Sequence, residues 1–350
     1  MSSTVKLLKL VGVMEKIKIL GAGLMCIDVV HNQKQTTIMN GGSCANVISV
    51  LSQIGFDSSI IRERYSDQFE AILSKTLASL GVKEIIYKRT AAKTPRIIEI
   101  LENNGHDFFT CCPNCGEKIL KLPLPTERDL GCLDIDFSEF DYFYCDRSSP
   151  GIRKIMDIIR EHHGLVVYEP NTARNIDSLL KSASHADIVK FSSDRVFPSI
   201  AERIRTTVKG LKLLISTQGQ EGLRFSHIQE NGEMSDWVHL PSEFCGPVID
   251  SSGAGDWLTA GFISELIKSN LSVSIDQFYD QKQISNMLTQ GMKYSHLCCA
   301  AVGAQGVFYS EQSIGAFNKL NNYNNLTSSV LGNEDFSTDG LCPLCLSKIS

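Results

Sequence analysis

Short apolar runs alternate with helical patterns along most of this chain of 350 residues. Strand-like runs occur at 16–23, 164–170 and 211–217, while segments such as 41–55 and 195–208 have apolar residues every three or four positions. This alternation predicts a mostly parallel α/β sheet that is covered by helices on both faces. Ligands of such sheets bind beyond the carboxyl ends of the strands, so helix starts at those ends are candidate sites.

One such helix start is the segment DSSGAGD at residues 250–256, which runs directly into a helical pattern. The first turn of a helix has backbone N–H groups without partners and the positive end of the helix dipole. Gly253, Ala254 and Gly255 leave those groups open to an anion such as a phosphate. Asp256 would repel that anion unless it faces a hydroxyl that attacks the phosphate. The alternative is that Asp256 only complements the dipole and the glycines only shape a turn.

A second helix pattern also opens on glycines, at the GGSCAN of residues 41–46. In the predicted sheet, both glycine-opened helix starts lie beyond the carboxyl ends of strands, although they are far apart in the sequence. We therefore predict that the two helix starts converge on one ligand, which favours a functional role over a merely structural one.

The composition restricts the class of protein further. Hydrophobic residues make up 43% of the chain and charged residues 21%, as in ordinary globular proteins. The net charge of −5 argues against a surface that binds nucleic acid and against a polybasic membrane contact. No apolar run is long enough to span a membrane, and the beginning does not resemble a signal peptide, so we expect a cytoplasmic protein. Residues 1–14 are interpreted as an N-terminal extension and 318–339 as a linker.

Five segments resemble the ribokinase-like (PfkB) carbohydrate kinase family and occur in its order: GAGLMCIDVV, GGSCANVISVLSQIG, EPNTAR, STQGQEGLRF and DSSGAGDWLTAGF. The resemblance implies a doubly wound kinase domain over residues 15–317. It also implies a small β lid from about 24–40 and 93–110, which agrees with a β-hairpin predicted at 94–110. The implied activity is ATP-dependent transfer of the γ-phosphoryl group to a hydroxyl of a sugar or related small polyol.

Residue roles follow from the same resemblance. The implied catalytic group is Asp256 as the base, with an anion hole formed by Gly253, Ala254 and Gly255. The implied substrate contacts are Asp28, Gly41, Gly42, Asn46 and Arg174. The implied nucleotide-binding positions are Ser192, Thr217, Gly219, Gly222 and Gly303. A homodimer is compatible with this interpretation and is left open.

Two departures from the family pattern bear on Mg²⁺ and on the substrate. Members often have Asn-x-x-Glu where this chain has SSDR at 192–195, so Arg195 replaces an acid and only Asp194 supplies a carboxylate. Ser43 stands where sugar-specific members often have a lysine, so ribose itself is not indicated. A nucleoside kinase of the same family and a non-catalytic sensor of sugars or nucleotides are the two alternatives.

Two cysteine pairs have no counterpart in this family. Both read Cys-Pro-x-Cys: one is Cys112 and Cys115, within 111–118, and the other is Cys342 and Cys345, within 340–348. This spacing is typical of zinc ribbons, because the turn lets both thiolates reach one metal ion. We expect one structural Zn²⁺ bound by all four cysteines. The alternatives are a redox pair, a zinc site between two copies of the chain, unrelated thiols, and, most remotely, a cysteine-based oxidoreductase.

Overall fold

The computed structural model describes residues 16–32, 36–102, 105–244, 246–269, 278, 280–321 and 341–347. The predicted N-terminal extension, and most of the predicted linker, lie outside these residues. The linker prediction began too early, because helix α10 (Glu311–Asn321) includes residues 318–321. The side chain of Asn321 is buried and accepts a hydrogen bond of 2.5 Å from the hydroxyl of Tyr294, which fixes the end of this helix.

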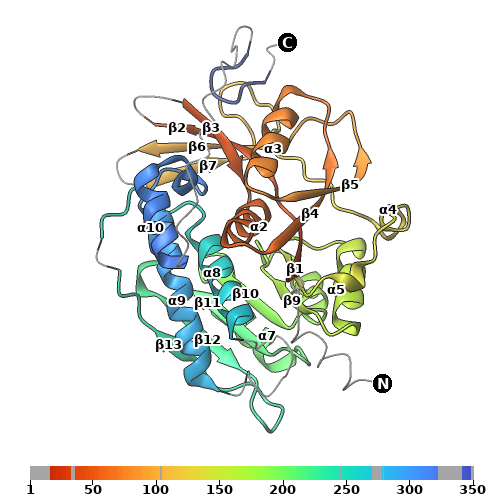
Figure 1. The fold of residues 1–350 in the computed structure, drawn as a ribbon, viewed down its shortest axis with the longest axis vertical. Helices are drawn as coiled ribbons and strands as arrows, with labels where there is room; N and C mark the ends of the chain where they lie inside the picture. Colours follow the sequence, from red (N-terminus) through yellow and green to blue (C-terminus); the bar gives the residue numbers. More distant parts are fainter. Residues whose placement is uncertain are drawn as a thin grey trace.

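The larger of two sheets has nine strands in the order β13-β12-β11-β10-β9-β8-β1-β4-β5 (Figure 1). The seven strands from β11 to β5 are parallel, and β12 and β13 are antiparallel, so the predicted fold class is confirmed. The strands are β1 (Lys18–Ala22), β4 (Asp57–Arg64), β5 (Lys83–Arg89), β8 (Tyr142–Cys145), β9 (Leu165–Tyr168), β10 (Ile188–Ser192), β11 (Leu213–Thr217), β12 (Leu223–His227) and β13 (Val238–Leu240).

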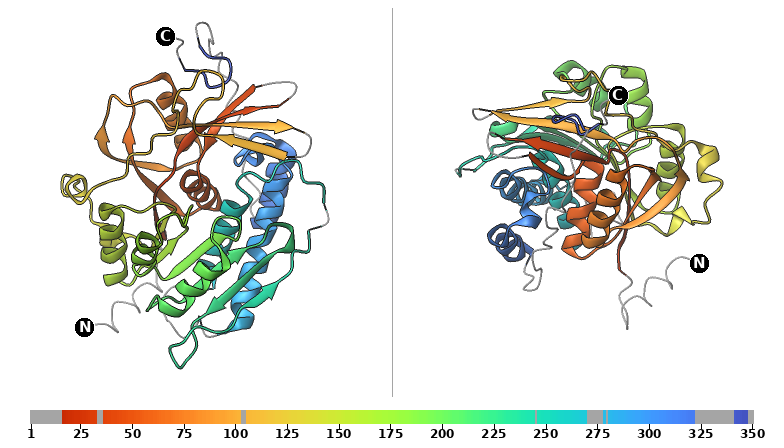
Figure 2. Two further views of the ribbon diagram at one scale, coloured as in Figure 1. Left: turned by 180° about the vertical axis from the view of Figure 1, so that it is seen from behind. Right: turned by 90° about the horizontal axis from the view of Figure 1, so that it is seen from above.

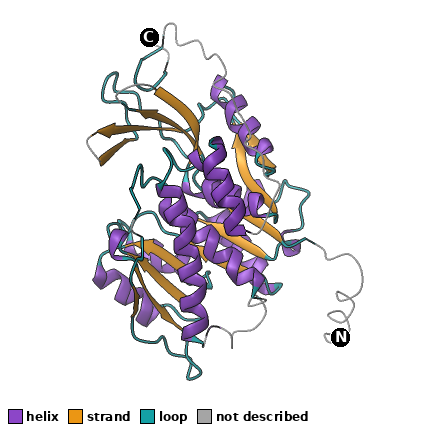
Figure 3. Ribbon diagram, turned by 60° about the vertical axis from the view of Figure 1, so that its left-hand side comes forward, coloured by secondary structure: helices purple, strands orange, loops and turns teal. Residues whose placement is uncertain are grey.

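Helices cover both faces of this sheet, as Figure 3 shows. Successive residues of a strand point to opposite faces, and in β1 both Ile19 and Leu20 are fully buried, in separate clusters. One cluster contains residues of α2 (Ser43–Ile54), α3 (Gln68–Ser79), α8 (Ala254–Lys268), α9 (Gln281–Cys299) and α10. The other contains residues of α4 (Glu127–Leu130), α5 (Pro150–Glu161), α6 (Ile176–Ala183) and α7 (Pro198–Thr207).

The smaller sheet has the order β3-β2-β6-β7 and is called the lid sheet below. Its strands are β2 (Cys26–His31), β3 (Thr36–Gly41), β6 (Arg96–Glu102) and β7 (Gly105–Phe109). They coincide with the segments predicted for the lid, and β6 and β7 form the predicted hairpin. Figures 1 and 2 show that the short segment 341–347, coloured blue, lies beside this sheet and far from helix α7.

Most of the predicted elements agree with the structure, but five strands or α-helices were missed. Strand β8 has only four residues, all of them buried, so it lacks the alternation by which a strand is recognised. Strand β5 and helices α4, α6 and α10 were also not predicted. Among the residues that the structure describes, no helix combines the length and the apolar character needed to cross a membrane.

Candidate active site

Helix α8 begins at the GAGD segment, and its first turn carries Asp256. Gly253 precedes the helix with φ of 76°, in the left-handed region that favours glycine. A side chain is excluded there as well, because a Cβ on Gly253 would lie 2.3 Å from the Cβ of Ala304. The N–H of Ala254 donates to the carbonyl of Ser251 over 3.1 Å. The helix itself offers no acceptor to the N–H groups of Gly255 and Asp256, and Gly253 places no side chain above them.

Helix α2, the second glycine-opened helix, begins next to the first turn of α8. The Asn46 amide, in the first turn of α2, donates a hydrogen bond of 2.8 Å to the Asp256 carboxylate. Gln305 in turn donates to the oxygen of Asn46 over 3.4 Å. The two helix starts therefore lie side by side, as predicted, and their binding of one shared ligand stays a prediction. Both Asn46 and Asp256 are buried, so the bond forms where water does not compete for it.

A buried ion pair between Lys190 and Glu169 contacts the first turn of α8. The Lys190 ammonium group donates to the Glu169 carboxylate over 2.5 Å and to the carbonyl oxygen of Gly255 over 2.8 Å. Glu169 also accepts hydrogen bonds from the hydroxyls of Tyr144 and Thr259, over 3.1 and 2.9 Å. Neither Lys190 nor Glu169 was singled out from the sequence. Lysine within an otherwise apolar strand, KF at 190–191, was the signal that could have identified the pair.

Asp28 lies on β2 of the lid sheet and is partly buried. Its carboxylate contacts Gly41 so closely that a Cβ on that glycine would lie 1.7 Å from an Asp28 oxygen. Gly42 has φ of 94°, so the two glycines are required for different reasons. The thiol of Cys26 donates to Asp28 over 3.2 Å. The pKa of Asp28 is raised to about 7, mainly by burial and also by the negative charge of Asp256, while the hydrogen bond from Cys26 acts in the opposite direction.

A second lid carboxylate, that of Glu99 on β6, was missed from the sequence. It is fully buried and accepts a hydrogen bond from the hydroxyl of Ser252, just before α8. Burial raises the pKa of Glu99 to about 8, helped by the charge of Asp250. Asp250 itself accepts from the backbone N–H groups of Ser252 and Gly303, over 2.8 and 2.7 Å. The lid sheet is therefore joined to the segment that precedes helix α8.

The carboxylate of Asp256 has the pKa that a base near neutral pH needs. Burial raises this pKa to about 6, with a further contribution from the negative charge of Glu169. The ammonium group of Lys190 and the hydrogen bond from Asn46 act in the opposite direction. Asp256 is therefore ionised at neutral pH, and its environment makes it a better proton acceptor than an exposed aspartate.

The family model for pfkB family carbohydrate kinases matches residues 16–310. The chain belongs to this family. It is therefore a carbohydrate kinase, and the resemblance inferred from its sequence motifs is confirmed. Fructokinase of Escherichia coli is 24% identical to it over 293 residues, which cover 78% of this chain and 90% of that relative.

Solved structures with low identity show the same fold for this kinase. Fructokinase of Xylella fastidiosa with bound ATP has a TM-score of 0.66 at 21% identity, over 83% of this chain and 94% of that one. Ribokinase of Giardia lamblia also has a TM-score of 0.66, at 15% identity, over 82% and 96% of the chains. Adenosine kinase of Sinorhizobium meliloti has a TM-score of 0.62 at 15% identity, over 83% and 96%.

The nucleotide-binding positions predicted for this kinase fall into two groups. Ser192 and Thr217 are neighbours in register at the carboxyl ends of β10 and β11. Gly219 and Gly222 follow in the adjoining turn, both with positive φ. Gly303 lies elsewhere: a Cβ on it would be 2.2 Å from the sulfur of Met39 in the lid sheet. These roles stay predictions, and the structure brings four of the five positions together.

Two other predicted binding groups of the kinase are at the surface. Arg174, predicted to contact the substrate, has an exposed side chain in the loop after β9, and its role stays a prediction. Asp194 is exposed after β10, with its carboxylate 3.5 Å from the hydroxyl of Ser192. Mg²⁺ takes one or two carboxylates together with phosphate and water oxygens, and Asp194 fits that requirement whereas Arg195 supplies no acceptor.

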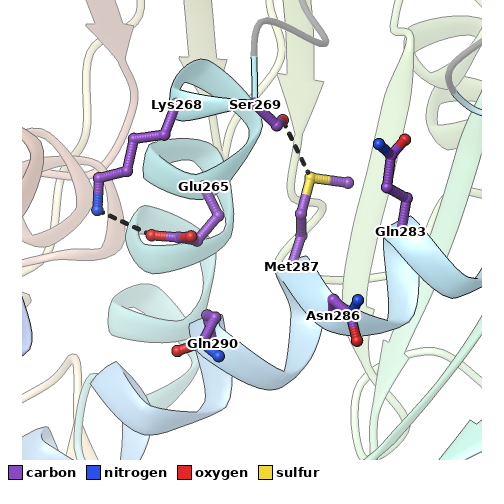
Figure 4. A pocket seen from close by; sticks show the side chains of 7 residues that line it. All are labelled: Glu265, Lys268, Ser269, Gln283, Asn286, Met287 and Gln290. Atoms are coloured by element: carbon purple, nitrogen blue, oxygen red, sulfur yellow. Dashed lines mark hydrogen bonds and ion pairs between the residues drawn. The ribbon is translucent and has the colours of Figure 1, made fainter.

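A surface pocket between α8 and α9 is separate from this site (Figure 4). It is lined by Glu265, Lys268, Ser269, Gln283, Asn286, Met287 and Gln290. A helix rises 1.5 Å per residue, so Glu265 is about 14 Å along α8 from Asp256. The pocket lies at the opposite end of the helix, and we assign it no part in catalysis.

The four cysteines of the Cys-Pro-x-Cys pairs are brought together outside the catalytic centre. The sulfur atoms of Cys112, Cys115, Cys342 and Cys345 all lie within 4.8 Å of one another, as the ligands of a single metal ion would. The two segments are far apart in the sequence but adjacent in the structure. The geometry is consistent with the predicted zinc-ribbon element.

Replacing Asp28 with asparagine tests the cost of burying its carboxyl group. With a folded-state pKa of about 7, the folded kinase keeps a proton that the unfolded chain releases above about pH 4. The contribution of Asp28 to stability therefore falls between about pH 4 and pH 7 and stays low above that range. We expect Asp28→Asn to raise the free energy of unfolding by ~1–2 kcal/mol at about pH 8.

Urea unfolding of the ligand-free protein at several pH values measures this effect. The gain should shrink as the pH is lowered towards about 4, where folded and unfolded chains both hold the proton. Asp177→Asn, in the exposed first turn of α6, is the matched control and should show no such trend. A gain that is the same at every pH would contradict the raised pKa.

Proposed function

We propose that this kinase transfers the γ-phosphoryl group of ATP to a hydroxyl of a sugar or related small polyol, with Asp256 as the base. The observation that carries the proposal is the position of Asp256: its carboxylate is in the first turn of α8 and is held there by Asn46. Two lid carboxylates, Asp28 and Glu99, lie close enough to this cluster for the acids to perturb one another's pKa values. The pattern suits a ligand that has several hydroxyl groups.

The chemical step uses one proton and one phosphoryl transfer. The Asp256 carboxylate accepts the proton of the attacking hydroxyl, whose oxygen forms a bond to the γ-phosphorus of ATP. The bond between that phosphorus and the bridging oxygen breaks, and ADP leaves with the electron pair. Transition states of this kind depend on positioning and charge stabilisation more than on basicity, so a pKa of about 6 is sufficient.

The anion hole stabilises the charge that develops in this step. The first turn of α8 directs N–H groups at the phosphoryl oxygens, and Gly253, Ala254 and Gly255 allow those oxygens to approach. Lys190 holds the carbonyl of Gly255 from the other side, which keeps the turn in place before the ligand arrives. Asp194 would bind Mg²⁺ through water, and the ion would neutralise phosphate charge.

The acceptor is recognised by carboxylates and by an amide. Asp28 and Glu99 can accept hydrogen bonds from hydroxyls, and the Asn46 amide can both donate and accept. Fructose is the first acceptor to test, because the relatives from Escherichia coli and Xylella fastidiosa are named fructokinases. Nucleosides are the second, because adenosine kinase of Sinorhizobium meliloti shares the fold.

The catalytic role is tested by Asp256→Asn. We expect kcat to fall by at least ~100-fold, because the general base is removed. The dissociation constant of an ATP analogue should stay within a few-fold, because the anion hole remains. Coupled measurement of ADP release and equilibrium binding of the analogue provide the two quantities.

The matched control for this variant is again Asp177→Asn, an acid in the first turn of another helix. It should keep wild-type turnover. If Asp256 only complemented a helix dipole, the two variants would behave alike. Turnover of Asp256→Asn within a few-fold of the wild type would rule out the mechanism.

The pH dependence of kcat/KM reports the same group in the free enzyme. Asp256 must be ionised to accept a proton, so activity should be lost as the pH falls through its pKa of about 6. We expect an acid limb near that value, with kcat/KM falling tenfold for each further pH unit. An acid limb at the ordinary pKa of an exposed aspartate, about 4, would contradict this assignment.

A further inference from the structure

The sulfur atoms of the four-cysteine cluster are spaced as zinc ligands are. Tetrahedral zinc binds thiolate at about 2.3 Å, which places the sulfur atoms about 3.8 Å apart. The sulfurs of Cys112 and Cys342 are 3.8 Å apart, and those of Cys115 and Cys345 are 3.5 Å apart. A disulfide would require about 2.05 Å, so neither of these cross-segment pairs is oxidised in this structure.

The two cysteine segments have the same backbone conformation, although they come from distant parts of the chain. The N–H of Gly116 donates to the carbonyl of Cys112 over 2.9 Å, and that of Leu346 donates to Cys342 over 2.8 Å. In both segments the N–H of the first cysteine donates to the carbonyl five residues later, over 2.8 and 2.7 Å. Two copies of one knuckle therefore face each other across the sulfur atoms.

The second knuckle holds a residue in a conformation that it does not favour. Gly116 ends the first knuckle with φ of 74°, and Leu346 stands at the same position of the second with φ of 57°. A left-handed conformation is unfavourable for a residue with a side chain, because its Cβ then lies too close to the following carbonyl oxygen. Such a conformation persists only where its surroundings require it, and the shared requirement of both knuckles is to direct two thiolates to one point.

Polar groups around the sulfurs favour the charged, metal-bound state. The Asn114 amide of the first knuckle donates to the sulfur of Cys342 in the second, over 3.3 Å. Arg96 of the lid sheet is buried beside the cluster and donates to the hydroxyl of Ser347 over 3.0 Å. Four thiolates around Zn²⁺ have a net charge of −2, which the Arg96 guanidinium partly offsets. Cys115 is exposed, so an ion can enter from the surface.

We infer that Cys112, Cys115, Cys342 and Cys345 bind one structural zinc ion within a single chain, and that this ion fastens segment 341–347 to the lid sheet. His31 on β2 lies 2.8 Å from the carbonyl oxygen of Leu344, and Arg96 on β6 contacts the same segment. The apolar contacts come from Ile98 and Ile100, which pack on the cysteine cluster. The ion replaces a hydrophobic core in this small element.

The four-cysteine cluster lies on one face of the lid sheet, and the acids of the candidate active site lie on the other. Residues of a strand alternate between faces, so Glu99 points away from the face of β6 that carries Ile98 and Ile100. One face of the lid sheet therefore meets the zinc site, and the other presents Glu99 to Ser252 and Asp28 to the acceptor. This step rests on the proposed kinase function. Zinc should hold the lid strands in place for the sugar without taking part in phosphoryl transfer.

Zinc content is the first test, because it does not depend on kinase activity. We expect elemental analysis of protein purified without chelators to find about one zinc per chain. Co²⁺ loaded in its place should show the visible absorption of a tetrahedral thiolate complex. Protein without metal, or with a disulfide between any two of these cysteines after purification under reducing conditions, would overturn the site.

Cys115→Ser is the diagnostic variant, because its side chain is exposed and its loss disturbs packing least. Its control is Cys111→Ser, the neighbouring exposed cysteine, whose sulfur lies outside the cluster and donates to the carbonyl of Gly116. We expect Cys115→Ser to lose zinc on dialysis against a chelator and Cys111→Ser to keep it. Asn114→Ala should weaken zinc binding by ~10-fold. Equal zinc retention in Cys115→Ser and the control would contradict the assigned ligands.

Kinetics test the link to the lid. Cys115→Ser should raise the KM for the sugar several-fold more than the KM for ATP, while kcat changes little and Cys111→Ser matches the wild type. Zinc loss with an unchanged KM for the sugar would overturn the link and leave the metal site intact. Kinase activity absent in every variant, together with one zinc per chain in the wild type, would count against the proposed function rather than the metal site.

Discussion

The hydrogen bond between Asn46 and Asp256 joins two helix starts that the chain reaches by separate routes. Each helix brings the positive end of its dipole to the same point, so a buried carboxylate and a transferring phosphate can both be stabilised there. The bond forms only if β1 and β10 lie where they do in the sheet, since α2 packs near β1 and Lys190 on β10 supports α8. The strand order of the large sheet therefore determines where the Asp256 carboxylate lies.

Helices and hairpins whose apolar or turn residues follow a regular spacing could be predicted from the sequence. The pairing of one strand with another could not. Helix α8 and the β6–β7 hairpin were recognised because their apolar or turn residues repeat in a way that local sequence displays. The Glu169–Lys190 pair depends on the register of β9 beside β10, which no local pattern contains. Glu99 was missed for the same reason: alternation shows that it faces one side of the lid sheet, but not that Ser252 lies opposite.

Strand β6 shows how one element serves two sites. Its residues Ile98 and Ile100 pack on the cysteine cluster, and Glu99 between them accepts a hydrogen bond from Ser252, just before helix α8. The apolar cluster around the cysteines is small, and elements with so little core are often stabilised by a metal ion. With the inferred zinc ion bound, the cysteine knuckles would stabilise the face of the lid sheet that carries Ile98 and Ile100, and the opposite face carries the acids of the proposed sugar site.

The face of the lid sheet that carries Asp28 and Glu99 places these acids where their ionised forms are disfavoured. The pKa values of Asp28, Glu99 and Asp256 are all raised, so each of these acids is less stable ionised in the fold than in water. In the proposed function, substrate hydroxyls would donate to these carboxylates and relieve part of that cost, so that ligand binding would stabilise the fold. Lys190 is bonded to Glu169 and Gly255 and offsets the charge on the α8 side of the site only. On the lid side no such cation is bonded to Asp28 or Glu99 among the described residues, so rigid strands would have to hold these acids together, and the inferred zinc site on the opposite face of the sheet would provide that rigidity.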